Sequence, residues 1–489
     1  MIIAHDFGTS GNQTSLHDEA GRTLGICTVG YPTHFAPDGV AEQDPDDWWR
    51  AVGEATRRLL SEARVDPARI QAVGLSGQMM GAVFLDAAHR PVRPAFIWAD
   101  QRSIPQTRRL VQAVGQQAAY AQLGHRINAT YTLPKAMWVR EMEPGLWART
   151  RAVCVAKDYV TVRLTGVLVT DPSDASSTDA YDLNSGAWSS GMLDAAAIPL
   201  EVMPEIVPST TIASGLTAEA AEHTGLKIGT PVVVGGGDGP MASVGVGAIT
   251  PDDSAYVSLG SSAWVAFSAA RPLIDPHMRS FTFEHIVPGY YAPNATIQAG
   301  GASLHWVADL LEPGGGTDRF PKLLAEVDTA RAASDGLFFL PYLLGERSPH
   351  WNPAAAGTFA GLGRHHGRGS VVRAVLEGVA FNLSSCLDGF GENCRTIDSV
   401  DVIGGGASSD VWLAAADGQR VGDTGPTPKH HRRGEQPGRR GDCARRRGTG
   451  RLLPCPTTIG RDRRIRATPR RERRLRRQAR HLCRGLRAA

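Results

Sequence analysis

Long apolar runs and a leader-like beginning are both missing from this sequence of 489 residues. No stretch approaches the roughly 18 consecutive apolar residues that span a bilayer, and the opening MIIAHDFGTS lacks the basic-then-apolar layout of a signal peptide. The seven cysteines have neither CxxC nor Cys/His metal spacing. These absences predict a cytoplasmic protein with reduced thiols, without a membrane partner and without a structural zinc.

Aromatic residues and acidic charge are scarce at the end of the chain. Residues 418–489 contain no Phe, Tyr or Trp and one Val, with 23 Lys and Arg against 5 Asp and Glu, whereas residues 1–417 have 29 against 44. A segment of this kind cannot bury enough apolar surface to offset its ordering entropy, which predicts a disordered tail. One interpretation is a reading-frame shift near residues 413–420 of a GC-rich gene. The other is a basic arm for nucleic acid, which the lack of aromatic residues disfavours.

Two kinds of phosphate-binding motif are absent as well. The sequence has no GxxxxGK[ST] loop and no set of Gly-rich loop, HRD and DFG, so it is neither a P-loop protein nor a protein kinase. Instead, short apolar runs alternate with glycine turns and helical patterns up to about residue 417, which predicts an α/β fold. The segments IIAHDFGTS and SAYVSLGSSAWVAF share a strand, turn, strand pattern. This repeat predicts two related domains, 1–245 and 246–417, ahead of the tail 418–489.

Glycine-containing turns follow four of the predicted strands. They are Asp6 with Gly8, Thr9 and Ser10; Asp238 after three glycines; Gly260 with Ser261; and Gly404–Gly406. Turns at strand ends expose backbone N–H groups to phosphates, and carboxylates there can hold Mg²⁺. A single such turn is more often an ordinary structural turn than a site. Four such turns in this order along the chain predict a protein that transfers phosphoryl groups.

The motifs that contain these turns resemble the FGGY carbohydrate kinases over about residues 1–417. They include DFGTS, WADQR, KDYVTVRLTG, GGGDGP, FLPYLLGERSPHWNP and VIGGGASSDVW. The resemblance implies two RNase H-like domains of the sugar kinase, Hsp70 and actin type around an interdomain cleft, with ATP and Mg²⁺ as cofactors. GERSPHWNP and KDYVTVRLTG are most similar to xylulokinases, which implies conversion of D-xylulose to D-xylulose 5-phosphate.

The resemblance also implies roles for single residues. Asp238 matches the catalytic base, and Asp6 matches the carboxylate that organises Mg²⁺, with Asp238 beside the metal. The residues that match sugar-binding positions are Met79, Met80, Asp238 and Gly239, and those that match nucleotide-binding positions are Thr9, Ser10, Gly260, Ser261, Gly301, Gly406 and Asp410. Packing in the core is an equally good explanation for the two methionines.

Three departures from the family pattern leave the sugar open. Met80 stands where a histidine is expected, Gly239 where an asparagine is usual and Gln13 where a basic residue is customary. A thioether cannot donate a hydrogen bond to a sugar hydroxyl. The alternatives are therefore a kinase for another ketose, a polyol or an aldonate, or a non-catalytic actin-fold protein. A homodimer is possible, and the altered end predicts weak ATP binding by the chain as written.

Overall fold

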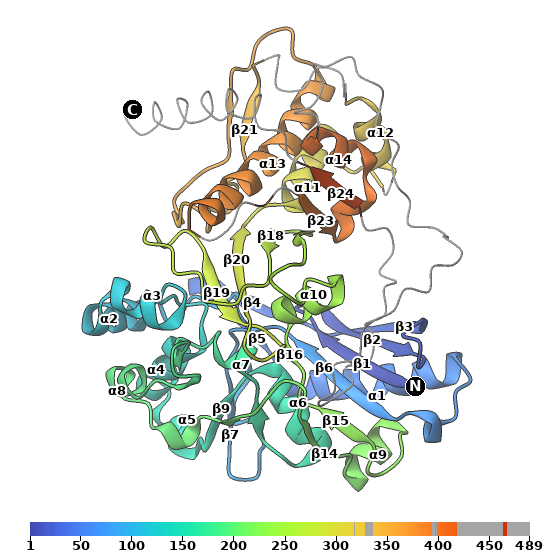
Figure 1. The fold of residues 1–489 in the computed structure, drawn as a ribbon, viewed down its shortest axis with the longest axis vertical. Helices are drawn as coiled ribbons and strands as arrows, with labels where there is room; N and C mark the ends of the chain where they lie inside the picture. The colour runs from blue at the N-terminus through green and yellow to red at the C-terminus, as the bar shows by residue number, and fades with distance from the viewer. Residues whose placement is uncertain (317, 328–335, 394–396, 398, 418–462, 467–489) are drawn as a thin grey trace.

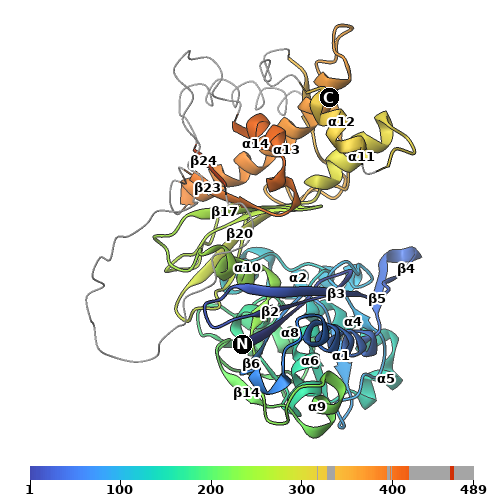
Figure 2. The ribbon, with the colours of Figure 1, turned by 90° about the vertical axis from the view of Figure 1, so that its right-hand side faces the viewer.

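The computed structural model describes residues 1–316, 318–327, 336–393, 397, 399–417 and 463–466, and the statements below concern these residues. Two domains, each built on one large sheet, lie one above the other (Figure 1). Figure 2 shows the same stack from the side, with α10 (Asp238–Val246) between the two sheets. Apart from four residues, the Arg-rich segment lies outside the described residues, so its predicted lack of order is not assessed there.

The first domain is built on a seven-stranded sheet in the order β14-β15-β6-β1-β2-β3, with β16 also paired to β6. The sheet consists of β1 (Ile2–Phe7), β2 (Gly11–His17), β3 (Thr23–Gly30), β6 (Ala72–Gly77), β14 (Ile212–Gly215), β15 (Pro231–Val233) and β16 (Gly236–Gly237). β1 is antiparallel to β2 and parallel to β6. Ile3 and Phe7 alternate along β1 into the core, as period-two patterning requires.

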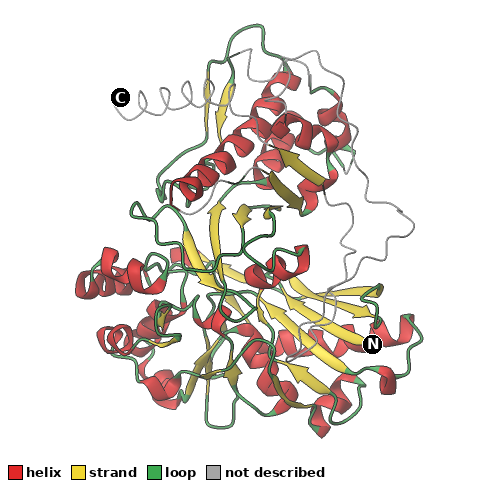
Figure 3. Cartoon of the chain, in the orientation of Figure 1, coloured by secondary structure: helices red, strands yellow, loops and turns green. Residues whose placement is uncertain are grey.

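Helices and short strands complete this domain (Figure 3). The helices are α1 (Pro45–Glu62), α2 (Ile104–Val114), α3 (Gln116–Leu123), α4 (Thr132–Met142), α5 (Pro144–Arg149), α6 (Ala156–Thr165), α7 (Pro172–Ala175), α8 (Ser190–Ala196) and α9 (Ala218–Thr224). The short strands are β4 (His34–Ala36), β5 (Val40–Gln43), β7 (Val83–Leu85), β8 (Ala95–Phe96), β9 (Ala152–Cys154), β10 (Val169–Thr170), β11 (Tyr181–Asp182), β12 (Ala187–Trp188) and β13 (Glu205–Ile206). Asp44 caps α1 through the amide of Asp46, and Pro45 begins it, as the acidic start of this segment predicts.

The second domain is built on a six-stranded sheet in the order β19-β20-β18-β17-β23-β24. Its strands are β17 (Ala255–Leu259), β18 (Ala263–Ala266), β19 (Phe281–Glu284), β20 (Tyr291–Ile297), β23 (Ser399–Ile403) and β24 (Arg463–Arg466), with a separate pair β21 (Phe338–Leu340) and β22 (Thr358–Ala360). Its helices are α11 (Gly301–Leu311), α12 (Arg319–Ala325), α13 (Arg368–Asn393) and α14 (Asp410–Asp417). In both ribbon views α11, α13 and α14 lie on the side of the sheet away from the first domain.

The two sheets repeat one pairing scheme. β1 is antiparallel to β2 and parallel to β6, and β17 is in the same way antiparallel to β18 and parallel to β23. β2 pairs with β3 and β18 with β20, again antiparallel in both cases. The repeated hairpin predicted from the sequence is therefore confirmed. Asp6 and Gly260 lie at corresponding strand ends of the two domains.

β24 corrects one expectation at the end of the chain. Arg463–Arg466 pairs antiparallel with β23, so these four residues of the tail form a strand rather than a disordered segment. The physical reason is that β23 presents unpaired main-chain groups at the sheet edge. An extended segment can complete them without side chains of its own to bury.

One described helix is long and apolar enough to cross a membrane by length and composition, Arg368–Glu392 within α13. Of its most apolar window, 61% is buried inside the protein. Val375, Val379 and Phe390 of α13 lie in the apolar core of the second domain. The helix thus has the burial of a core helix.

Candidate active site

Asp6 lies on β1, one residue before the strand ends. It pairs across the parallel ladder with Ser76 of β6, whose hydroxyl donates a hydrogen bond of 2.9 Å to Asp6 Oδ1. Desolvation by the surrounding protein raises the pKa of Asp6, and the Ser76 hydrogen bond opposes that shift. The carboxylate therefore lacks full hydration, which favours its use as a ligand for a cation.

The hairpin after β1 is tightly closed. The amide of Gly8 donates to the carbonyl of Gly11 at 3.1 Å. Trp98 Nε1 donates to the Thr9 hydroxyl at 2.9 Å, while the carbonyl of Thr9 accepts from Gln43 Nε2 at 2.6 Å. Ser10, at the tip, is exposed. Side-chain and main-chain groups of Thr9 are thus both held by the first domain.

Asp238 begins α10 directly after the glycine turn. Gly235 has φ +71°, and a Cβ there would lie 1.7 Å from the carbonyl oxygen of Leu75, so only glycine fits the turn. The amide of Gly239 donates to Asp238 Oδ1 at 2.8 Å. The surrounding protein, together with the negative charge of Asp6, raises the pKa of Asp238 to about 7, although its side chain remains exposed to solvent. Asp6 and Asp238 are therefore close enough for the charge of one to act on the other, and their predicted roles stay predictions.

The methionine pair occupies two different environments. Met79 is 5% exposed and packs in an apolar cluster with Tyr131 of the first domain and Phe281 of β19. A Cβ on Gly237 would lie 2.5 Å from Met79 Cγ, so the Met79 side chain lies directly against the turn that precedes Asp238. Met80 is partly buried and has φ +67°, the left-handed region. Packing explains the position of Met79, and its predicted contact with sugar remains a prediction.

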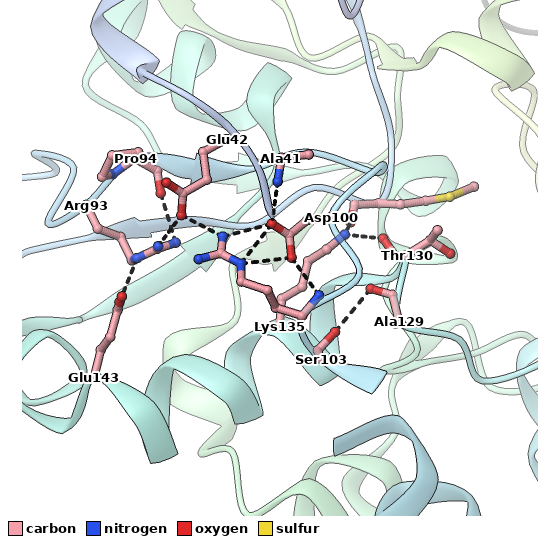
Figure 4. Close-up of polar contacts among 12 residues, drawn as sticks. Ala41, Glu42, Arg93, Pro94, Asp100, Ser103, Ala129, Thr130, Lys135 and Glu143 are labelled. Carbon is pink, nitrogen blue, oxygen red and sulfur yellow. Dashed lines mark hydrogen bonds and ion pairs between the residues drawn. The ribbon is translucent and has the colours of Figure 1, made fainter. Parts of the chain in front are cut away.

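An ionic network holds the chain behind Met80 (Figure 4). Buried Lys135 donates to the carbonyls of Met80, at 2.8 Å, and of Thr130, and burial lowers its pKa to about 7. Asp100 accepts from Arg102 Nε at 3.0 Å and from the amide of Ala41 at 2.8 Å. These bonds attach the WADQR segment to β5, while Lys135 holds the backbone at Met80.

The second domain contributes a backbone cradle. The amide of Gly301 donates to the carbonyl of Gly260 at 2.7 Å, and the amide of Ala302 donates to the carbonyl of Ser261 at 3.0 Å. A Cβ on Gly301 would lie 2.7 Å from that Gly260 oxygen. Gly406 lies against Leu259, at the end of β17, with 2.5 Å between its built Cβ and Leu259 Cγ. Four predicted nucleotide-binding positions are thus gathered at the carboxyl end of β17.

Asp410 lies one element farther on, as the first residue of α14. The preceding Ser409 caps this helix by accepting from the amide of Trp412 at 3.2 Å. Gly239, the remaining predicted sugar-binding position, accepts a hydrogen bond of 3.2 Å at its carbonyl from the hydroxyl of Tyr256. Tyr256 belongs to β17, so this bond ties α10 to the second sheet.

The two carboxylates suit Mg²⁺ bound together with phosphates. No group of three or more Asp, Glu, His or Cys suited to a metal occurs among the described residues. Mg²⁺ needs no such cage, since it is usually bound by one or two carboxylates plus phosphate oxygens and waters. The raised pKa values of Asp6 and Asp238 mean that a cation would relieve an existing electrostatic penalty there.

Several residues that shape this site carried no role in the sequence analysis. Ser76 bonds Asp6, Trp98 bonds Thr9, and Tyr256 bonds the α10 turn. For Ser76, the sequence did offer a signal, because it lies at the end of a predicted strand that could pair with β1. Trp98 lies 89 residues from its partner Thr9, and Tyr256 lies 17 residues from its partner Gly239. No local sequence pattern predicts such contacts.

Comparison with known proteins agrees with this geometry. The N-terminal domain of the FGGY family of carbohydrate kinases matches residues 1–245 and the C-terminal domain matches residues 255–417. The chain therefore belongs to the FGGY family of carbohydrate kinases, with the two-domain, actin-like fold predicted from the sequence.

The similar proteins include both xylulose kinases and a gluconokinase. The xylulose kinase of Escherichia coli is 34% identical over 87% of this chain and 88% of its own length. The gluconokinase of Bacillus subtilis is 28% identical over 84% of this chain and 81% of its own length. A solved structure of ligand-bound xylulose kinase from Lactobacillus acidophilus superposes with a TM-score of 0.78 at 28% identity, covering 85% of this chain and 84% of that one.

Proposed function

We propose that the chain transfers the γ-phosphoryl group of ATP to a hydroxyl of D-xylulose, giving D-xylulose 5-phosphate. The observation that carries the proposal is the juxtaposition of Asp6 and Asp238 next to a turn that only glycine can form. Asp238, with a pKa near neutrality, accepts the proton of the sugar hydroxyl as a general base. Asp6 holds Mg²⁺, which when bound neutralises phosphate charge during the transfer.

The second domain supplies the nucleotide side in this proposal. Thr9 and Ser10 of the first hairpin and Gly260 and Ser261 of the second approach the β- and γ-phosphates, and Gly301, Gly406 and Asp410 border the nucleotide. The backbone hydrogen bond between Gly260 and Gly301 supports this assignment, because it leaves no room for a side chain at Gly301. We place the domain boundary near residue 245, and we propose a cytoplasmic protein, where ATP is available.

D-Xylulose is favoured over other sugars by the xylulose kinase relatives and by the GERSPHWNP segment. A six-carbon aldonate is the second candidate, because the gluconokinase relative spans a similar share of the chain. An ADP-release assay over D-xylulose, gluconate, ribulose and glycerol discriminates between them. If gluconate is phosphorylated and D-xylulose is not, the proposed substrate is wrong. If none of the four compounds is phosphorylated, the kinase assignment is wrong.

The assay uses two proteins because we propose a frame shift at the Arg-rich segment. One is the 489-residue chain, and the other carries the reading frame restored after residue 417. The restored protein is expected to bind ATP more tightly and to turn over faster, as measured by calorimetry and ADP release. Equal affinity and equal turnover would show that residues 418–489 serve as a functional end of the chain.

A further inference from the structure

We propose that Ser173 is a positioning residue for the predicted base, because it fixes the Gly236–Asp238 turn through a hydrogen bond. The inference rests on the proposed role of Asp238. The Ser173 hydroxyl accepts from the amide of Gly237 at 3.0 Å and donates to Asp171 Oδ2 at 2.6 Å. Ser173 is 0% exposed, so water cannot replace it at the Gly237 amide.

A buried ion cluster lies behind Ser173. Lys157 Nζ is 3.3 Å from Asp171 Oδ1, 2.7 Å from Asp158 Oδ1 and 3.5 Å from Asp174 Oδ2, and all four side chains are at most 1% exposed. Asp171 also caps α7 by accepting from the amide of Ser173 at 3.0 Å. Lys157 thereby holds Asp171 as an acceptor, Asp171 orients the Ser173 hydroxyl, and Ser173 holds Gly237.

The turn, which also pairs with β6, is closely packed. A Cβ on Gly236 would lie 2.7 Å from Ser173 Oγ and 3.1 Å from Asp171 Oδ2. On the opposite side, a Cβ on Gly237 would meet Met79 at 2.5 Å. The glycine backbone is therefore clamped between α7 and Met79, and Asp238 follows it immediately. A buried amide left without its acceptor costs free energy, so loss of Ser173 shifts the turn and the carboxylate that it carries.

The cluster has no direct role in the chemistry assigned above. Lys157 and Asp158 lie in the first turn of α6, and Asp171 and Asp174 lie at the N-terminus of α7. Their effect on Asp238 passes through the Ser173 hydroxyl and the Gly237 amide. Burial raises the pKa of Asp174, Lys157 opposes that rise, and the charge of Asp238 adds to it.

The decisive variant is Ser173→Ala, with Ser209→Ala as its matched control. Ser209 is also buried, and its hydroxyl donates to the same Asp171 Oδ2 at 2.8 Å but has no bond to Gly237. The two changes therefore remove one donor each from one carboxylate oxygen. Only Ser173→Ala removes the acceptor of the Gly237 amide.

The first measurement is hydrogen exchange of the Gly237 amide in the 489-residue chain, which requires no activity. Exchange is expected to be about tenfold faster in Ser173→Ala and unchanged within about twofold in Ser209→Ala. Equal exchange in the two variants overturns the inference. If Ser173→Ala does not fold, Ser173→Cys keeps the volume with a weaker acceptor, and the same comparison with Ser209→Ala decides.

The second measurement is steady-state kinetics in the more active of the two proteins defined above. Ser173→Ala is expected to lower kcat about tenfold with the KM for sugar within about twofold, because a displaced base affects the transition state and leaves sugar binding intact. An unchanged kcat overturns the positioning role even if exchange is faster. A wild-type protein without kinase activity instead overturns the proposed function, and the exchange result still stands.

Discussion

The two domains contribute to the site in different ways although their sheets share one pairing scheme. In the first domain, the proposed site groups are the Asp6 and Asp238 side chains, which accept hydrogen bonds from Ser76 and from the Gly239 amide. In the second domain, Gly260 and Gly301 meet through main-chain groups alone, with 2.7 Å between the Gly301 amide and the Gly260 carbonyl. The two hairpins thus share the position of a strand end and differ in the groups that they present there.

This difference fits the needs of phosphoryl transfer. Proton removal and cation binding require groups that change or carry charge, which only side chains provide. A nucleotide that is bound and released needs dipoles and close approach, which glycine backbone supplies at low steric cost. The comparison can be tested by substitutions that remove a functional group in one domain and add a methyl group in the other.

Asp238→Asn should have the largest effect on this comparison. The amide cannot accept the proton of the hydroxyl, so kcat is expected to fall about 10²-fold or more with little change in the KM for sugar. Steady-state ADP release gives both constants. Asp194→Asn, on an exposed helix position, is the matched control and should leave both unchanged. A kcat within threefold of the wild type would place the base elsewhere.

Asp6→Asn should lower kcat less and should change the dependence on Mg²⁺. Loss of one carboxylate removes charge from the proposed cation site, so we expect about a tenfold fall in kcat at ordinary Mg²⁺ and partial recovery at high Mg²⁺. A titration of activity with MgCl₂ at saturating sugar measures the shift. If half-saturation by Mg²⁺ stays at the wild-type value, Asp6 does not hold the cation.

Gly301→Ala tests the backbone side of the comparison. The added methyl group would lie 2.7 Å from the Gly260 carbonyl oxygen, so the loop must move. We expect the KM for ATP to rise about tenfold while the KM for sugar is unchanged, since overpacking typically costs about 1–3 kcal/mol. Gly316→Ala is the control, because nothing lies within 4 Å of its built Cβ. Equal rises in both KM values would indicate a general disturbance of the fold.

The positions of strand ends could be predicted from the sequence because they depend on local features. Apolar runs that stop near Asp6, Asp238 and Gly260 mark where a chain leaves a sheet. In the structure β1 ends at Phe7, α10 begins at Asp238 and β17 ends at Leu259. The repeated hairpin followed from the same local pattern. The resemblance to a family then suggested which of these turns bind ligands.

Contacts between distant segments could not be predicted in this way. Ser76 meets Asp6 only because β6 lies parallel to β1 in one register, and the two residues are 70 positions apart. The left-handed backbone of Met80 depends on Lys135, which approaches from α4. β24 is formed by four residues whose composition favours disorder, because the edge of β23 supplies the hydrogen bonds.

The smallest expected effect is on stability, and it separates the charge of Asp238 from its catalytic role. Its pKa in the folded protein is about 7, above the ordinary aspartate value of 3.8, so the folded state binds the proton more tightly than the unfolded state does. The stability that this proton contributes is complete below pH 3.8 and is lost as the pH rises through about 7. Asp238→Asn carries no such charge. The melting temperature of Asp238→Asn minus that of the wild type should therefore increase between pH 5 and pH 8, by about 2 °C because solvent contact weakens the effect.

Thermal unfolding without ligands at both pH values measures this difference in melting temperature, with Asp194→Asn again as the control. A difference that stays constant with pH would mean that Asp238 is ionised throughout this range and that its carboxylate is better hydrated than its position beside Asp6 implies.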